Sequence, residues 1–415
     1  MDNRAFTQTT TLTNTNLHLA LAPALTPHGT ENTPTFFDGT LHQPRPFIES
    51  LRLLGELPKR TYTPHQRTQL ADPILSAHGD CLAMEAFSAC NSVYARIVYT
   101  ADAFDNGTIT HGTTNVDITP LLDSTLRTIT PNDTVGIRIG TTGLDLTTKT
   151  THHTERPVKL PERWIRGLAN ASALSRTLTH RCTLDAGATR RLLTTALNGN
   201  GYLHYSRKQP RLSPHPLPGS THIHTLARIE LLRKLAPYAT GLNIYGPTDP
   251  NPHSPTAVTL TMNNATATFV LTPHPARGFS GEGALLTEIN QQHLLDTAPT
   301  TYHFSSHITP NPPATTTELE TLGIIGWDLN THHFFHRQLP PNHYRNHRLE
   351  QSHTLTVDWI DTPPTGPHVA RIKNYRVEIN PDYCTCEWFR RYETTRGPCK
   401  HLLAAHRDHA QRHTP

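Results

Sequence analysis

The segment from residue 383 to residue 405 reads YCTCEWFRRYETTRGPCKHLLAA and holds three of the six cysteines of the chain. Its potential metal ligands form two matched pairs, Cys384 with Cys386 and Cys399 with His401. Zinc takes four protein ligands in a tetrahedron at about 2.0 to 2.3 Å, so a local motif must supply two pairs from two backbone elements. The C-x-C-x12-C-x-H pattern therefore predicts one zinc ion bound by these four residues.

The residues around each pair predict the elements that carry it. Ala370 to Ile379 is typical of a strand and Asn380-Pro381-Asp382 of a turn, so the first pair is expected on or beside a hairpin. Gly397-Pro398 interrupts the chain before the second pair, and Leu402 to His406 favours a helix, since proline suits the first helical turn. We expect a small ββα module in which zinc joins the hairpin to the start of the last helix.

Four protein ligands leave no coordination position for water or substrate, so the ion is expected to be structural. Two other histidines, His406 and His409, lie on the same expected helix and remain alternative fourth ligands, although His401 fits the paired spacing best. Zinc binding contributes on the order of 10 to 16 kcal/mol in small finger peptides, so this segment should not fold without it.

These residues resemble a SWIM-type zinc finger, in which the same cysteine and histidine pattern is followed by a hydrophobic run after Pro-Cys-Lys-His. Upstream segments resemble uncharacterised bacterial SWIM zinc-finger family proteins, namely Phe37-Asp38-Gly39, Cys90 to Arg96, Gly112 to Asp117 and Gly278 to Gly283. SWIM modules are generally proposed to bind DNA or other proteins, and bacterial relatives can be encoded beside MoxR-type AAA ATPases and von Willebrand A-domain proteins. The resemblance therefore implies a nucleic-acid contact or, alternatively, a protein-protein adaptor that works with such an ATPase system.

The rest of the 415-residue chain predicts an α+β fold, with a mixed strand and helix body before the finger. Segments typical of strands and of helices alternate along it. The expected strands are Cys90 to Tyr99 and Thr134 to Leu146, and a hairpin is expected over Ala257 to Leu271. The expected helices are Pro161 to Leu178, Ile223 to Tyr238, and one that is capped by Asp185 and runs to Leu197. Breaks rich in Thr and Pro divide the chain into a polar segment 1–46, a body 47–308, a small connecting region 318–360 and the finger 368–415.

The opening of the chain has neither a basic region nor an apolar run typical of a signal peptide, and no stretch has the roughly 18 apolar residues of a membrane helix. We expect a cytoplasmic, soluble protein whose thiols stay reduced, which favours metal binding by the clustered cysteines over disulfides.

Charge is concentrated in the finger. Residues 368–415 contain nine of the 37 Lys and Arg but only five of the 33 Asp and Glu, which leaves 28 of each for the rest of the chain. The sequence thus predicts a basic, nucleic-acid-binding surface with aromatic platforms from Trp388, Phe389 and Tyr392, and with cations from Arg390, Arg391, Arg396, Lys400 and Arg407. In the adaptor alternative, Trp388 or Phe389 would anchor a protein partner.

No catalytic residue is predicted, and we expect a protein that is not an enzyme. Gly278-Phe279-Ser280-Gly281-Glu282-Gly283 departs from the G-x-S-x-G nucleophile pattern at Glu282. The histidines at 152, 153, 332, 333 and 336 lack partners at a diagnostic spacing, and Cys81, Cys90 and Cys182 are expected to be small buried residues. No small-molecule substrate follows from these patterns.

Overall fold

The computed structural model describes residues 35–62, 73–158, 160–194, 199–207, 209–274, 278–281, 325–337, 347–360, 366–393 and 395–413, with short pieces at 11–12, 16–18, 24–26, 29–31, 286, 307–308 and 320. The described chain is α+β with several antiparallel sheets, as the sequence predicts. Residues 309–317, the expected break before the connecting region, lie outside the described residues, as do residues 361–365 of the break before the finger.

The largest sheet has eight antiparallel strands. In order they are β10 (His111–Asn115), β6 (Ile74–His78), β7 (Cys81–Phe87), β8 (Val93–Thr100), β21 (Ala265–Leu271), β20 (Thr256–Thr261), β19 (Gly241–Gly246) and β15 (Thr179–Asp185). The expected hairpin is present as β20 and β21, where the Thr259 and Thr268 hydroxyls hydrogen bond across the strands at 2.9 Å. Apolar and threonine side chains along these strands favour a sheet with a buried face.

A second sheet has five strands, β13 (His152–Glu155), β12 (Gly143–Thr147), β11 (Gly136–Gly140), β5 (Thr35–Leu41) and β9 (Phe104–Ile109). Strand β5 lies before residue 46, within the segment 1–46 that the sequence describes as polar. The predicted single strand from Thr134 to Leu146 is a hairpin, β11 with β12. Its turn ends at Gly143, where φ is +118° and a Cβ would lie 1.9 Å from the Glu155 carbonyl oxygen, so only glycine fits.

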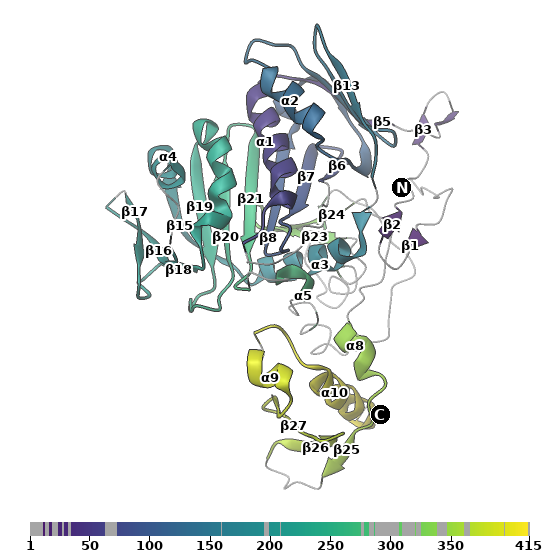
Figure 1. The fold of residues 1–415 in the computed structure, drawn as a ribbon, viewed down its shortest axis with the longest axis vertical. Coiled ribbons are helices and arrows are strands. Elements are labelled where there is room, and N and C mark those ends of the chain that lie inside the picture. The colour runs from purple at the N-terminus through teal and green to yellow at the C-terminus, as the bar shows by residue number, and fades with distance from the viewer. Residues whose placement is uncertain are drawn as a thin grey trace.

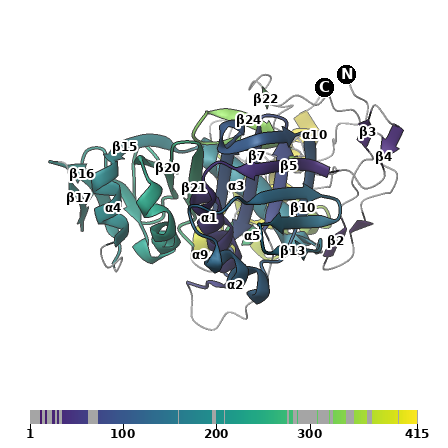
Figure 2. The ribbon, with the colours of Figure 1, turned by 90° about the horizontal axis from the view of Figure 1, so that it is seen from above.

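Helices cover the large sheet. In both ribbon views α1 (Pro44–Glu56) and α4 (Ala186–Thr194) lie on the same face of it (Figures 1 and 2). Asp185 caps α4 as predicted, because its Oδ1 accepts from the Ala188 amide at 2.8 Å. The segment expected as an α-helix up to Tyr238 is instead a 3-10 helix, η3 (Leu226–Tyr238), with Pro237 inside it. The structure also describes the helices α2 (Pro120–Thr128), α3 (Glu162–Arg176), α5 (Gly278–Gly281), η1 (Leu57–Lys59) and η2 (Ala101–Ala103).

Short strands form the smaller sheets. One consists of β1 (Thr11–Leu12), β2 (Asn16–His18) and β14 (Leu160–Pro161), and another of β3 (Ala24–Thr26) and β4 (Gly29–Glu31). A third has the order β17 (Gln209–Ser213), β16 (Gly201–Ser206), β18 (Thr221–Ile223), and a fourth the order β22 (His307–Ile308), β24 (His333–His336), β23 (Ile325–Asp328). None of the helices in the described ranges has the length and apolar composition that a membrane crossing needs.

The finger is a separate lobe at one end of the molecule (Figure 1). It has four antiparallel strands, β25 (Asp358–Ile360), β26 (His368–Ile372), β27 (Tyr375–Ile379) and β28 (Tyr383–Cys384), and three helices, α8 (His347–Ser352), α9 (Glu387–Tyr392) and α10 (Lys400–His413). The predicted strand 370–379 is two strands joined at Lys373, whose φ is +56°. The ββα core is present, and the connecting region adds β25 and α8 to it.

Candidate metal centre

Three thiols and one imidazole meet in the buried interior of the finger lobe. The ligand atoms of Cys384, Cys386, Cys399 and His401 all lie within 4.8 Å of one another, and Cys384 Sγ is 3.8 Å from His401 Nδ1. Ligands arranged tetrahedrally around zinc lie about 3.4 to 3.8 Å apart, given metal-ligand distances of about 2.0 to 2.3 Å. The cluster fits a single zinc ion.

Two helix starts hold the cysteines in place. Cys386 is the N-cap of α9, and its Sγ accepts from the Phe389 amide at 3.5 Å. Cys399 directly precedes α10, and its Sγ accepts from the Leu402 amide at 3.4 Å. Amide donors at a helix start stabilise negative charge on sulfur, so both positions suit thiolate ligands.

The three thiols lie close enough to share protons. A hydrogen bond to Cys386 raises the pKa of Cys384 to about 12, and hydrogen bonds from Cys384 and Cys399 lower the pKa of Cys386. The pKa of Cys399 rises because of its contacts with Cys384 and Cys386. Each further thiolate therefore costs more than the last, and a divalent cation that binds all three sulfurs offsets this repulsion.

The alternative histidine ligands are engaged elsewhere. His406 Nε2 lies 2.7 Å from Asp382 Oδ1, and the His409 ring packs 4.5 Å from the His368 ring and 5.7 Å from the Trp359 ring. The ring of His401 instead packs 4.6 Å from the Tyr375 ring and turns Nδ1 toward the sulfurs. His401 is thus the histidine that the structure brings to the cysteines.

An arginine from the connecting region supports the loop that supplies Cys399. Arg348 of α8 donates from Nη1 to the carbonyl oxygens of Arg396, Gly397 and Pro398 at 2.8, 3.2 and 2.8 Å. Its guanidinium also lies 4.2 Å above the centre of the Trp388 ring. Sequence reasoning missed Arg348, because it lies 51 positions before Cys399 in a segment with no metal-site pattern.

Residues 375–405 match the family model of the SWIM zinc finger. This segment is a SWIM zinc finger. No curated protein matches the chain. Among solved structures, the chain is similar to the proliferating cellular nuclear antigen from Entamoeba histolytica, with 12% identity and a TM-score of 0.40 over 58% of this chain and 100% of that one. It is also similar to the PCNA2-PCNA3 complex from Sulfolobus tokodaii, with 11% identity and a TM-score of 0.42 over 57% of this chain and 99% of that one.

The five predicted nucleic-acid contacts of the SWIM finger fall into two groups. Arg390 and Arg391 are exposed on α9. Arg396 is buried, with its guanidinium 5.2 Å from the Tyr392 ring centre. Lys400 and Arg407 are half-buried; Lys400 Nζ donates to Gln351 Oε1 at 3.0 Å, and Arg407 Nη1 is a buried atom. The five side chains therefore do not share one exposed surface.

The predicted aromatic platforms are also occupied. Phe389 is buried in the finger core, and Trp388 is packed between Arg348 and Tyr392, whose ring lies 4.7 Å away. The Tyr392 ring in turn contacts His274 of the body at 6.0 Å. The exposed aromatic side chain of the finger is Tyr383, which sequence reasoning did not single out.

The body residues considered in the sequence do not assemble into a second metal group within the described ranges. Ser280 lies in the short helix α5. His153 pairs with Glu155 at 2.8 Å, and His336 is buried, where desolvation lowers its pKa to about 4. Cys90 is buried as predicted, whereas Cys81 and Cys182 are half-buried.

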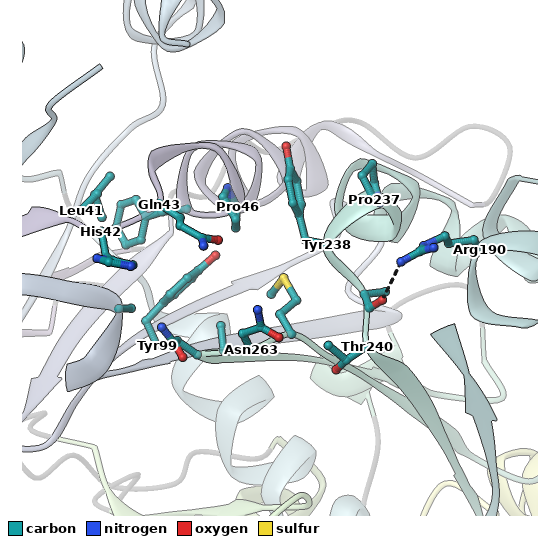
Figure 3. Close-up of a pocket in the computed structure, with 16 residues that line it drawn as sticks. Leu41, His42, Gln43, Pro46, Tyr99, Arg190, Pro237, Tyr238, Thr240 and Asn263 are labelled. Atoms are coloured by element: carbon teal, nitrogen blue, oxygen red, sulfur yellow. Dashed lines mark hydrogen bonds between the residues drawn. The ribbon is translucent and has the colours of Figure 1, made fainter. Parts of the chain in front are cut away.

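A pocket of about 350 Å³ opens between the start of α1, the end of η3 and the β20–β21 turn (Figure 3). Tyr99, Tyr238 and Met262 give it apolar walls, and Asn263 lies on its lower side in Figure 3. The Arg190 guanidinium is already bound to the Ala239 carbonyl at 3.5 Å. No carboxylate is among the described residues that line the pocket.

Proposed function

We propose that the SWIM finger is a structural zinc module that presents Arg390 and Arg391 to a nucleic-acid backbone. The observation that carries the proposal is the position of these two arginines. They are exposed, adjacent in sequence, and lie on the helix whose N-cap is the ligand Cys386. Zinc binding would order α9 and so set where the two positive charges point.

The structural role of zinc is supported by the burial of the site. All four ligands are buried and supplied by the protein, which leaves no open coordination position for a substrate. The small core around them consists mainly of residues from the β26–β27 hairpin and the first turns of α10. A core of this size supplies little free energy, so the metal would hold hairpin and helices together.

A second group of cations supports a polyanionic partner. Arg371 and Arg376 face each other across β26 and β27, and both are exposed, as is Lys373 in the turn. Like charges directly opposite each other destabilise a sheet. Acidic side chains offset part of this repulsion, because Glu378 accepts from Arg376 Nε at 2.6 Å and Asp358 of β25 lies opposite Arg371. An anionic ligand such as a phosphate backbone would relieve the repulsion.

Salt dependence tests the proposal. The zinc-loaded full chain should bind single- or double-stranded DNA or RNA at about 50 mM salt, with affinity falling steeply as salt rises. The Arg390→Gln/Arg391→Gln variant should flatten the log-log slope by about 1.8 on duplex DNA, or about 1.4 on a single strand, because two phosphate contacts are lost. Arg412→Gln is the matched control: Arg412 is exposed on α10 but paired with Asp408 at 2.5 Å, so its loss should leave the slope nearly unchanged.

An absence of binding to every nucleic acid at 50 mM salt would overturn the proposal and favour the protein adaptor. The observation behind that alternative is an exposed apolar side chain on each edge strand of the finger sheet, Tyr383 on β28 and Ile360 on β25. A protein partner held there should then lose about 2 kcal/mol or more of binding free energy on Tyr383→Ala and show little salt dependence.

A further inference from the structure

The first turn of η3 places an arginine in the interior of the body. Arg228 is 0% exposed, and its Nη1 donates to the carbonyl oxygen of Thr272, just after β21. Within the described ranges, its Nε and Nη2 atoms are buried and have no hydrogen-bond partner. A guanidinium removed from water without a counter-ion or full hydrogen bonding costs several kcal/mol, so this arrangement calls for a partner.

The two unpaired atoms lie on one edge of the guanidinium. Nε and Nη2 donate in parallel, and this geometry matches two oxygens of a carboxylate or phosphoryl group. A second unpaired group lies on a neighbouring segment: both amide atoms of Asn91 are buried without a partner among the described residues. The backbone links the segments, because Thr272 N donates to Ser92 O at 3.1 Å and Phe279 N donates to Asn91 O at 2.7 Å.

The electrostatic surroundings favour an anion. Desolvation lowers the pKa of Arg228 to about 10. The described groups that act in the opposite direction are Cys90 and Tyr62, and neither is a carboxylate. Burial lowers the pKa of His274 to about 4, and the further contributions come from Arg396 and other basic groups. The pKa of His224 is lowered by burial and then by Arg228. The two histidines are therefore neutral near pH 7, so Arg228 and Arg396 carry the positive charge of this region, and no described carboxylate is among the groups that raise the pKa of Arg228.

We propose that the body contains an internal oxyanion site in which the Nε–Nη2 edge of Arg228 binds a carboxylate or phosphoryl group of a small ligand. The site lies where β8 begins and β21 ends, beside α5, at the end of the large sheet that faces the SWIM finger (Figure 1). His274 connects it to the finger through its ring contact with Tyr392. This site is distinct from the exposed arginines of the proposed nucleic-acid contact.

Thermal unfolding of the zinc-loaded full chain tests the site with inorganic phosphate, sulfate and acetate, each compared with chloride at equal ionic strength. Phosphate and sulfate stabilise many proteins without binding, so the readout is the difference between wild type and Arg228→Met in the same salt. We expect phosphate or acetate to raise the wild-type Tm by roughly 2 to 4 °C more than that of the variant. A larger effect of phosphate identifies a phosphoryl ligand, and a larger effect of acetate a carboxylate.

Two further variants keep the test decisive. Arg228→Lys retains the charge but lacks the paired donors, so it should lose most of the anion-dependent shift even if Arg228→Met does not fold. Arg233→Met removes an exposed arginine of the same helix and should behave as wild type. Equal anion effects on wild type and Arg228→Lys would overturn the site and assign the buried edge to water.

Discussion

Cys386 and Cys399 each serve two purposes in the SWIM finger. As ligands they supply sulfur to the site, and as the residues that begin α9 and α10 they accept backbone amides that would otherwise lack partners. Helix formation and metal binding therefore depend on the same two side chains. This explains why the pattern of ligands, rather than a large core, is the strongest signal in this part of the sequence.

At the residue scale, substitution of single histidines tests the ligand set. His401→Gln should reduce bound zinc well below one equivalent, because Nδ1 of His401 faces the sulfurs. His406→Gln should keep a full equivalent, since His406 is hydrogen bonded to Asp382 instead. Metal content after dialysis against a weak chelator measures both. The assignment is wrong if the two variants exchange these results.

At the scale of elements, the β23–β24 hairpin is attached to the large sheet through charged groups. Arg337, directly after β24, pairs with Glu85 of β7, and both side chains are almost completely buried. Arg96 of β8 pairs with Asp328 of β23, and its guanidinium lies 3.8 Å from the centre of the Phe335 ring. Buried ion pairs often add little net stability, so we infer that these two pairs act mainly on where the hairpin docks.

Breaking the buried Arg337–Glu85 pair should therefore lower the free energy of unfolding strongly only when one of the two charges stays behind without its partner. We expect Glu85→Gln to lower the free energy of unfolding by about 3 to 5 kcal/mol, and Glu85→Gln/Arg337→Met to lower it by clearly less. Denaturant titration followed by circular dichroism measures both values. Arg138→Gln is the comparison: its pair with Asp38 is exposed at 3.0 Å, and its loss should cost at most about 1 kcal/mol.

At the scale of the whole molecule, two adjacent leucines of α10 face different partners. Leu402 packs in the finger core with the cysteines and the β26–β27 hairpin. Leu403 packs instead against Ala169 and Ala173 of the body helix α3, together with Leu286. Helix α10 thus stabilises the zinc site with one face and attaches the finger to the body with an adjacent face.

Alanine at each position should separate these two roles. Leu402→Ala should weaken zinc retention, because it opens a cavity in the finger core that costs about 2 to 5 kcal/mol. Leu403→Ala should retain zinc but speed protease cleavage between the body and the finger, since the finger can then detach while folded. Metal content and limited proteolysis of the full-length variants distinguish the outcomes. Equal zinc loss in both variants would contradict the separation.

Local patterns predicted the zinc site because its chemistry is short-range in sequence. The four ligands fall within a span of eighteen residues, and the proline, turn and helix residues in and beside this span specify the elements that carry the ligands. The same local reasoning found the β20–β21 hairpin and the Asp185 cap, where turn and capping residues act on their immediate neighbours. It missed the turns at Lys373 and within 140–143, because two short strands joined by a tight turn have the composition of one longer strand.

Which side chains a partner can reach depends on how distant segments of the chain pack together. Arg396, Phe389 and Trp388 were expected at the surface from their residue types and neighbours, yet Arg396 and Phe389 are buried and Trp388 is half-buried under Arg348. Arg348 reaches the zinc loop, and Arg228 becomes an unpaired charge, only when separate elements pack together. Burial depends on contacts between remote parts of the chain, whereas ligand spacing and turn chemistry are properties of a few consecutive residues. The sequence therefore predicted the zinc ligands and the turns next to them, but not which side chains of the finger are buried.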